Sequence, residues 1–121
     1  TALHIAVQNG SVEMTELLCK AGVDGNKAMQ GGWTPLHIAS HQGALELVRL
    51  IVAGGNSEIE RTMYLGWTAL FVAAQMEQEE VGQFLCEAKA DLDGPLQLAR
   101  ETKEVSAVKS LEDWQRFHVT A

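Results

Sequence analysis

Threonine and histidine recur in this sequence at a spacing that could support nucleophilic catalysis. His4 follows Thr1 by three residues, and His37 follows Thr34 by three. A histidine base beside a hydroxyl is one part of such a site, which also needs an orienting group and oxyanion donors. The same spacing lets the imidazole reach back to a helix N-cap, as in a capping box. Because the motif occurs in tandem and Phe71 replaces the histidine in a third copy, we favour the structural role.

Other reactive side chains give no stronger indication of catalysis. His37 and His41 lie four residues apart, as metal ligands on one helix face do, but no second ligand pair accompanies them. Cys19 and Cys86 occupy the similar settings LLCKAG and FLCEAK, typical of small buried hydrophobic residues in a reducing compartment. A glycine-rich phosphate loop is absent from the sequence. We therefore predict no catalytic residue, no metal and no cofactor.

Composition narrows the class of partner. The chain has 121 residues and a net charge of −7, enough for one domain with a modest core. A negative chain is a poor ligand for nucleic acid, so a basic or mixed-charge protein surface is the better candidate. We find neither an apolar run of about 18 residues nor a signal peptide, and we expect no membrane insertion. We expect an intracellular, cytoplasmic or nuclear protein that is monomeric by itself.

The sequence repeats itself. TALHIAVQNG begins at Thr1, TPLHIASHQG at Thr34 and TALFVAAQME at Thr68, at intervals of 33 and 34 residues. A weaker fourth copy, GPLQLARET, begins at Gly94, only 26 residues after the third. Such periods are typical of solenoids, in which each unit buries its apolar face against the next.

Each copy predicts two short helices followed by a loop. Thr34 is a favourable N-cap, Pro35 suits the first helical position, and Gly43 suits the end of the helix. The apolar segment ALELVRLIVA, residues 44–53, predicts the second helix of that copy. Helices of this length are marginal alone, so stacking must stabilise them.

These motifs resemble the ankyrin repeat family over essentially the whole chain. The matching segments are TPLH at 34–37, ALH at 2–4 and LLCKAGVDGN from Leu17. The resemblance implies an all-α repeat solenoid of stacked helix-turn-helix repeats with projecting β-hairpin fingers. We place the repeats at 1–33, 34–67 and 68–93, with a degenerate C-terminal capping repeat at 94–121. Repeat one lacks its leading finger, so we expect a fragment of a longer protein.

The third repeat departs from the family pattern. Phe71 replaces the usual histidine, Glu77 the usual glycine, and Glu79 a normally buried leucine. Gly82 lies inside the second helix, where it costs about 1 kcal/mol relative to alanine. We expect repeat three to be the least regular unit.

The C-terminal repeat departs further. Eight residues are missing between it and repeat three, so 90–96 should form a tight turn without a finger. Trp114 and Phe117 should both fold back onto the end of this repeat.

In the ankyrin family, finger tips and exposed first-helix positions form the binding surface. The matching positions here are Met29, Gln30 and Trp33 on the first finger, Met63, Tyr64, Leu65 and Trp67 on the second, and His41, Gln42, Gln75 and Met76 on the first helices. MYLGW is unusually apolar for a finger tip, and Tyr, Trp and Met are enriched at interfaces. The two tryptophans either contact a partner or shield the repeats, and the tip could instead pack against the rest of a longer protein.

We therefore predict a non-catalytic module that binds a partner protein or peptide, basic or mixed in charge and carrying an apolar anchor. The alternative is a regulatory or substrate-recruiting segment of a larger enzyme, channel or receptor. His41 is a candidate for titration near neutrality that would adjust affinity.

Overall fold

The computed structural model describes residues 1–54 and 58–119, the last two by backbone alone. Residues 55–57 and 120–121, within predicted repeats two and four, lie outside the described residues. The described helices are α1 (Ala2–Gln8), α2 (Val12–Lys20), α3 (Pro35–Gln42), α4 (Leu45–Ala53), α5 (Ala69–Gln75), α6 (Glu79–Glu87), α7 (Asp93–Thr102) and α8 (Val105–Val119). None of them is long and apolar enough to span a bilayer.

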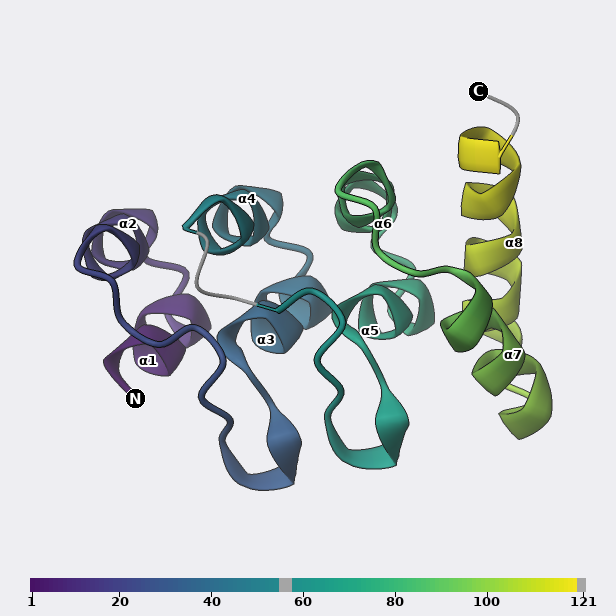
Figure 1. The fold of residues 1–121 in the computed structure, drawn as a ribbon, viewed down its shortest axis with the longest axis horizontal. Helices are drawn as coiled ribbons and strands as arrows, with labels where there is room; N and C mark the ends of the chain where they lie inside the picture. Colours follow the sequence, from purple (N-terminus) through teal and green to yellow (C-terminus); the bar gives the residue numbers. More distant parts are fainter. Residues whose placement is uncertain (55–57, 120–121) are drawn as a thin grey trace.

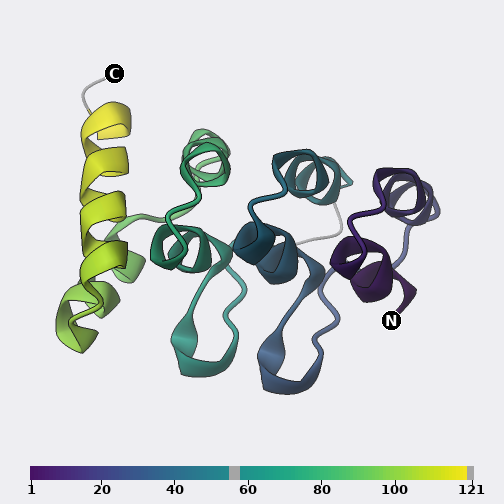
Figure 2. The same cartoon turned by 180° about the vertical axis from the view of Figure 1, so that it is seen from behind.

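The first six helices form two layers of a solenoid. Helices α1, α3 and α5 lie in one layer and α2, α4 and α6 in the other, and each pair stands beside the next (Figure 1). The view from behind shows the same order, with two loops projecting beyond the layer of α1, α3 and α5 (Figure 2). The predicted all-α repeat solenoid is confirmed.

The core runs without a break from one pair to the next. Leu36 and Ala39 of α3 are buried together with Leu47, Val48 and Ile51 of α4. The same cluster continues into the helices on either side. Helices of seven to nine residues would be marginal alone, so this shared burial is what holds them.

The two projecting loops are finger 1 (Met29–Trp33) and finger 2 (Met63–Trp67). Each contains a 3-10 turn, at Gln30–Gly32 and Tyr64–Gly66 respectively. The Met29 amide donates to the Trp33 carbonyl at 2.8 Å, and Met63 donates to Trp67 at 2.9 Å. The fingers thus differ from the expected β-hairpins, because the described residues contain no strand. A ladder needs repeated pairs along both flanks, whereas each finger is closed by this bond across one turn.

Repeat three is more regular than we expected. Helices α5 and α6 have seven and nine residues, the same lengths as α1 and α2. Glu77 itself adopts the left-handed conformation, φ +56°, that Gly43 adopts at φ +72° in repeat two. A side chain at Gly82 would overlap the indole of Trp114, so this glycine makes room for another helix.

The irregular unit is the C-terminal one. The predicted turn at 90–96 ends early, because α7 begins at Asp93. The carboxylate of Asp91 accepts hydrogen bonds from the amides of Asp93 and Gly94 at 3.2 and 3.3 Å and so caps the helix. No finger projects between α6 and α7 (Figure 1).

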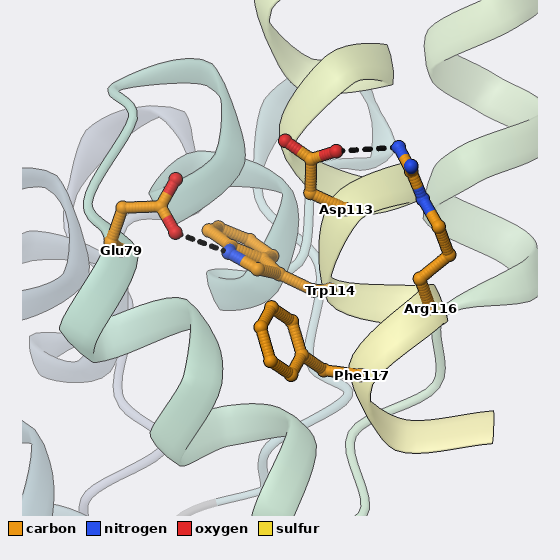
Figure 3. Close-up of a pocket in the computed structure, with 5 residues that line it drawn as sticks. All are labelled: Glu79, Asp113, Trp114, Arg116 and Phe117. Carbon is orange, nitrogen blue, oxygen red and sulfur yellow. Dashed lines mark hydrogen bonds and ion pairs between the residues drawn. The ribbon is translucent and has the colours of Figure 1, made fainter. Parts of the chain in front are cut away.

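The long helix α8 closes the stack by packing against α5, α6 and α7. Trp114 is fully buried, and its Nε1 donates to Glu79 at 3.0 Å (Figure 3). Phe117 is 70 % exposed, so the expectation that it also folds back was wrong. It lies one turn further along α8 and lines an open hollow beside Trp114.

Candidate protein-interaction surface

The repeated threonine–histidine pair is a helix cap. The Thr34 hydroxyl accepts from the His37 amide, and Nδ1 of His37 accepts from the Thr34 amide at 3.1 Å. Because Nδ1 is an acceptor, the neutral ring carries its proton on Nε2. Burial lowers the pKa of His37, while the carbonyls of Arg61 and Trp67 near the ring oppose that shift. The structural role that we favoured for this pair is confirmed.

His4 makes the same cap and also joins repeat one to finger 1. Its Nδ1 lies 2.6 Å from the Thr1 hydroxyl, and its Nε2 lies 3.0 Å from the Trp33 carbonyl oxygen, to which it donates. Burial is the main cause that lowers its pKa. Both histidines are therefore neutral structural groups, with ring nitrogens directed at the protein.

The thiols are poorly placed for nucleophilic chemistry. Cys19 and Cys86 are both free, and Cys86 is buried. Burial raises the pKa of the Cys86 thiol to about 11 and also raises the pKa of Cys19. Nucleophilic cysteines instead need a lowered pKa. In the part of the chain that the structure describes, no three His, Cys, Asp or Glu side chains converge as a metal site would require.

The tip of finger 2 presents two large side chains to solvent. Tyr64 is 70 % and Leu65 59 % exposed. Leu65 has φ +76°, a left-handed conformation that costs a branched residue about 1 kcal/mol, whereas Gly31 fills the equivalent place in finger 1 at φ +85°. Leu65 is therefore both strained and solvent-exposed, which neither packing nor turn geometry explains.

The two finger tryptophans cover the starts of the helices that follow them. Trp33 lies edge-on to His37 and His41, with ring centroids 6.4 and 5.6 Å apart. Trp67 lies over Phe71 with centroids 4.6 Å apart and planes inclined by 33°. Both tryptophans are half-buried, so each shields its repeat while part of its ring stays accessible. Their contact with a partner stays a prediction.

The predicted first-helix contacts divide into two kinds. His41 and Met76 are exposed at the ends of α3 and α5. Gln42 donates to the Gln8 carbonyl at 3.3 Å, and Gln75 donates to the Glu104 carboxylate at 2.9 Å. These glutamines link neighbouring repeats, and their contact with a partner stays a prediction.

The remaining predicted finger residues lie where the repeat pattern places them. Met29 is 39 % exposed and Gln30 is exposed on finger 1, while Met63 is half-buried in finger 2. The two fingers stand side by side on one edge of the solenoid (Figure 1). The structure thus brings the finger residues together, with the largest exposed side chains on finger 2.

Sequence reasoning missed the hollows near the C-terminal unit, two of which border repeat three. One is lined by Glu79, Trp114 and Phe117 between α6 and α8 (Figure 3). The other lies between finger 2 and α7, next to Gly66 and Leu98. The eight missing residues between repeats three and four were the sequence signal for the second hollow.

Comparison with known proteins gives consistent matches. A family model described as "Ankyrin repeats (3 copies)" matches residues 1–62, and the model "Ankyrin repeat" matches residues 65–95. Protein phosphatase 1 regulatory subunit 12A of Mus musculus is 42 % identical over 73 residues, which are 60 % of this chain and 7 % of the relative.

Two further relatives each match part of the chain. Ankyrin repeat and SOCS box protein 3 of Bos taurus is 38 % identical over 93 residues, 75 % of this chain and 18 % of the relative. Protein phosphatase 1 regulatory subunit 27 of Homo sapiens is 43 % identical over 54 residues, 45 % of this chain and 35 % of the relative. The matched segments therefore span a minor part of each of these relatives.

Proposed function

The chain belongs to the ankyrin repeat family, and we propose that it is a non-catalytic module whose finger edge binds a partner protein. Tyr64 and Leu65 would be the apolar anchors, with Met29, His41 and Met76 as surrounding contacts. The observation that carries this proposal is the strained, exposed Leu65 at a position where glycine is the unstrained choice.

The chemistry of the finger edge supports binding to a partially apolar surface. Tyrosine and leucine bury a large area, and the rigid stack beneath finger 2 limits the entropy lost on association. The net charge of −7 favours a partner surface that is basic or mixed in charge. Two free cysteines support an intracellular, reducing setting.

The test compares folding with binding in one double variant. Tyr64→Ala with Leu65→Gly removes both anchors and also relieves the strain at position 65. We expect unchanged or higher thermal stability, together with a loss of at least about 30-fold in affinity for proteins captured by the wild type, as for anchor residues elsewhere.

A matched control removes equally exposed side chains elsewhere. Phe117 is 70 % and Leu17 61 % exposed, close to the values for Tyr64 and Leu65. Phe117→Ala with Leu17→Ala should retain binding. Equal loss in both double variants would mean adsorption to any apolar surface, and full binding by the finger variant would exclude the finger edge as the site.

A second candidate is a regulatory or substrate-recruiting segment of a larger enzyme, channel or receptor. It is supported by two relatives named as regulatory subunits of protein phosphatase 1 and by the small share of each relative that the chain matches. The same finger edge would then recruit a catalytic subunit or its substrate. To test it, the chain is added to protein phosphatase 1 and the rate of dephosphorylation of a phosphoprotein substrate is measured. An unchanged rate at a high concentration of the chain would exclude protein phosphatase 1 as the enzyme that it regulates.

A further inference from the structure

The two fingers pack against each other through a glycine. A Cβ at Gly32 would lie 2.9 Å from the Met63 Cα and 3.2 Å from the Tyr64 nitrogen. Real Cβ atoms do not approach backbone so closely, so only glycine lets finger 2 lie this near to finger 1. The backbone of finger 2 is therefore fitted to Gly32 of finger 1.

Gly66 occupies the same position in finger 2, and nothing packs on it closely. The nearest heavy atom to a Cβ there is Leu98 Cδ2, at 4.0 Å. Gly66 is exposed, whereas Gly32 is half-buried. The turn that begins α7 projects no finger (Figure 1). A hollow of about 340 Å³ lies between finger 2 and this turn.

This hollow, which we call the finger slot, is acidic with an apolar side. Glu60, Thr62 and Gly66 line it from the finger 2 side, and Asp91, Pro95 and Leu98 from the α7 side. One oxygen of Glu60 accepts from the Asp91 amide at 2.7 Å, and both carboxylates are exposed. Arg61, the basic neighbour in sequence, lies 3.7 Å from Glu58 instead.

We propose that the finger slot binds an exposed turn of a partner protein, in the position that a third finger would hold. The main chain of that turn packs on Gly66, as Met63 and Tyr64 pack on Gly32, and a lysine or arginine beside it faces Glu60 and Asp91. The proposal extends the proposed function to a second site on the same edge, but it depends on no contact with Tyr64 or Leu65.

The probe is a cyclic peptide with the chain's own finger sequence, RTMYLGWT, residues 61–68. It has the backbone that already fits a finger glycine, and it carries an arginine. Titrated into the ¹⁵N-labelled chain, it should shift the amide signals of Gly66, Thr62 and Leu98 saturably. A cyclic peptide of the same composition in scrambled order should not. Absent shifts, or equal shifts with both peptides, would overturn the proposal.

The decisive variant is Gly66→Ala, with Gly22→Ala as its control. Both glycines have a left-handed backbone, φ +79° and +77°, and a Cβ at Gly22 meets nothing within 4 Å. The two variants should therefore lose similar stability. Only Gly66→Ala should weaken peptide binding, by at least 10-fold, because its Cβ occupies the point of closest approach. Equal affinity in the two variants would contradict the slot.

Charge and self-association provide two further checks. Glu60→Gln keeps an acceptor for the Asp91 amide and removes the charge. It should therefore lower the affinity for the peptide several-fold and reduce the salt dependence of binding. Glu80→Gln, at an exposed carboxylate outside the slot lining, should do neither.

Self-association is the other check. If the amide signals of Gly66, Thr62 and Leu98 move with the concentration of the chain alone, a second copy occupies the slot and the assignment to a partner protein is wrong. Peptide binding in the finger slot needs no contact with the side chains of Tyr64 and Leu65 of the chain. The slot proposal and the proposed function of the finger tip can therefore fail independently.

Discussion

The two finger–helix joints, from Trp33 to His37 and from Trp67 to Phe71, stabilise the start of the following helix in different ways. In both, a threonine caps the helix: Thr34 accepts from the His37 amide and Thr68 from the Phe71 amide. His37 then completes a capping box with its ring nitrogen, whereas Phe71 lies under Trp67. The N-cap is thus retained in both joints, while the ring beneath the tryptophan can act through a hydrogen bond or through aromatic contact.

The fingers themselves differ in the same manner. Gly31 and Leu65 share a left-handed backbone, but only Leu65 adds an exposed side chain to it. Gly32 is packed against the next finger and Gly66 is open. Finger 1 is therefore covered on one side by finger 2, whereas finger 2 has an open side and the larger exposed side chains at its tip.

The largest expected effect tests the aromatic joint. Phe71 is fully buried, so Phe71→Ala should lower the free energy of unfolding by about 3–5 kcal/mol, as for other buried phenylalanines. Urea unfolding followed by circular dichroism measures it. Met76→Ala, at the exposed end of the same helix, should change it by less than about 0.5 kcal/mol. A loss near 1 kcal/mol for Phe71→Ala would mean that the contact between the Phe71 and Trp67 rings contributes little to stability.

A smaller difference in unfolding free energy should distinguish substitutions at the two finger glycines, Gly32 and Gly66. Gly32→Ala and Gly66→Ala each incur the left-handed backbone cost of about 1–2 kcal/mol. Gly32→Ala also forces a clash with the Met63 backbone, which should add about 1–3 kcal/mol. The difference between their unfolding free energies therefore measures finger–finger packing. Equal losses would show that the fingers separate without cost.

The smallest effect tests the polar joint through pH. Burial lowers the folded-state pKa of His37 below its unfolded value near 6.5, so the unfolded chain binds the proton more tightly. Stability from this group is complete above that value and falls as pH drops below it, by at most about 1.4 kcal/mol per pH unit.

The matched variant for the pH prediction is His37→Gln, because glutamine can also complete a capping box. Urea midpoints measured from pH about 7.5 down to about 5.5 should fall less steeply in the variant than in the wild type. Parallel pH profiles would mean that the His37 ring takes up its proton equally in both states. His4, whose pKa is also lowered by burial, should contribute to the pH dependence in the same direction.

Sequence reasoning predicted the helices well because their ends are local. Thr34 and Gly43 bound α3 through hydrogen bonds to residues three or four positions away, and Pro35 suits the first turn because no amide is needed there. Sequence reasoning failed where the role of a residue depends on contact with a residue distant in the chain. Gly82 seemed a defect in α6, yet it is the space that Trp114 of α8 fills. The hydrogen bonds of Gln42 to Gln8 and of Gln75 to Glu104 also join residues 34 and 29 positions apart, which no local pattern shows.

The sequence by itself determined the repeat, the helix caps and the apolar faces, since each depends on residue type and short spacing. It also located the finger tips by their place in the repeat. Only the tertiary structure decided that Phe117 stays exposed, that Trp114 packs against Gly82 of α6, and that finger 2 has an open side next to Gly66. Those outcomes depend on how α7 and α8 pack against repeat three, and contacts between residues distant in the chain leave no local pattern to read.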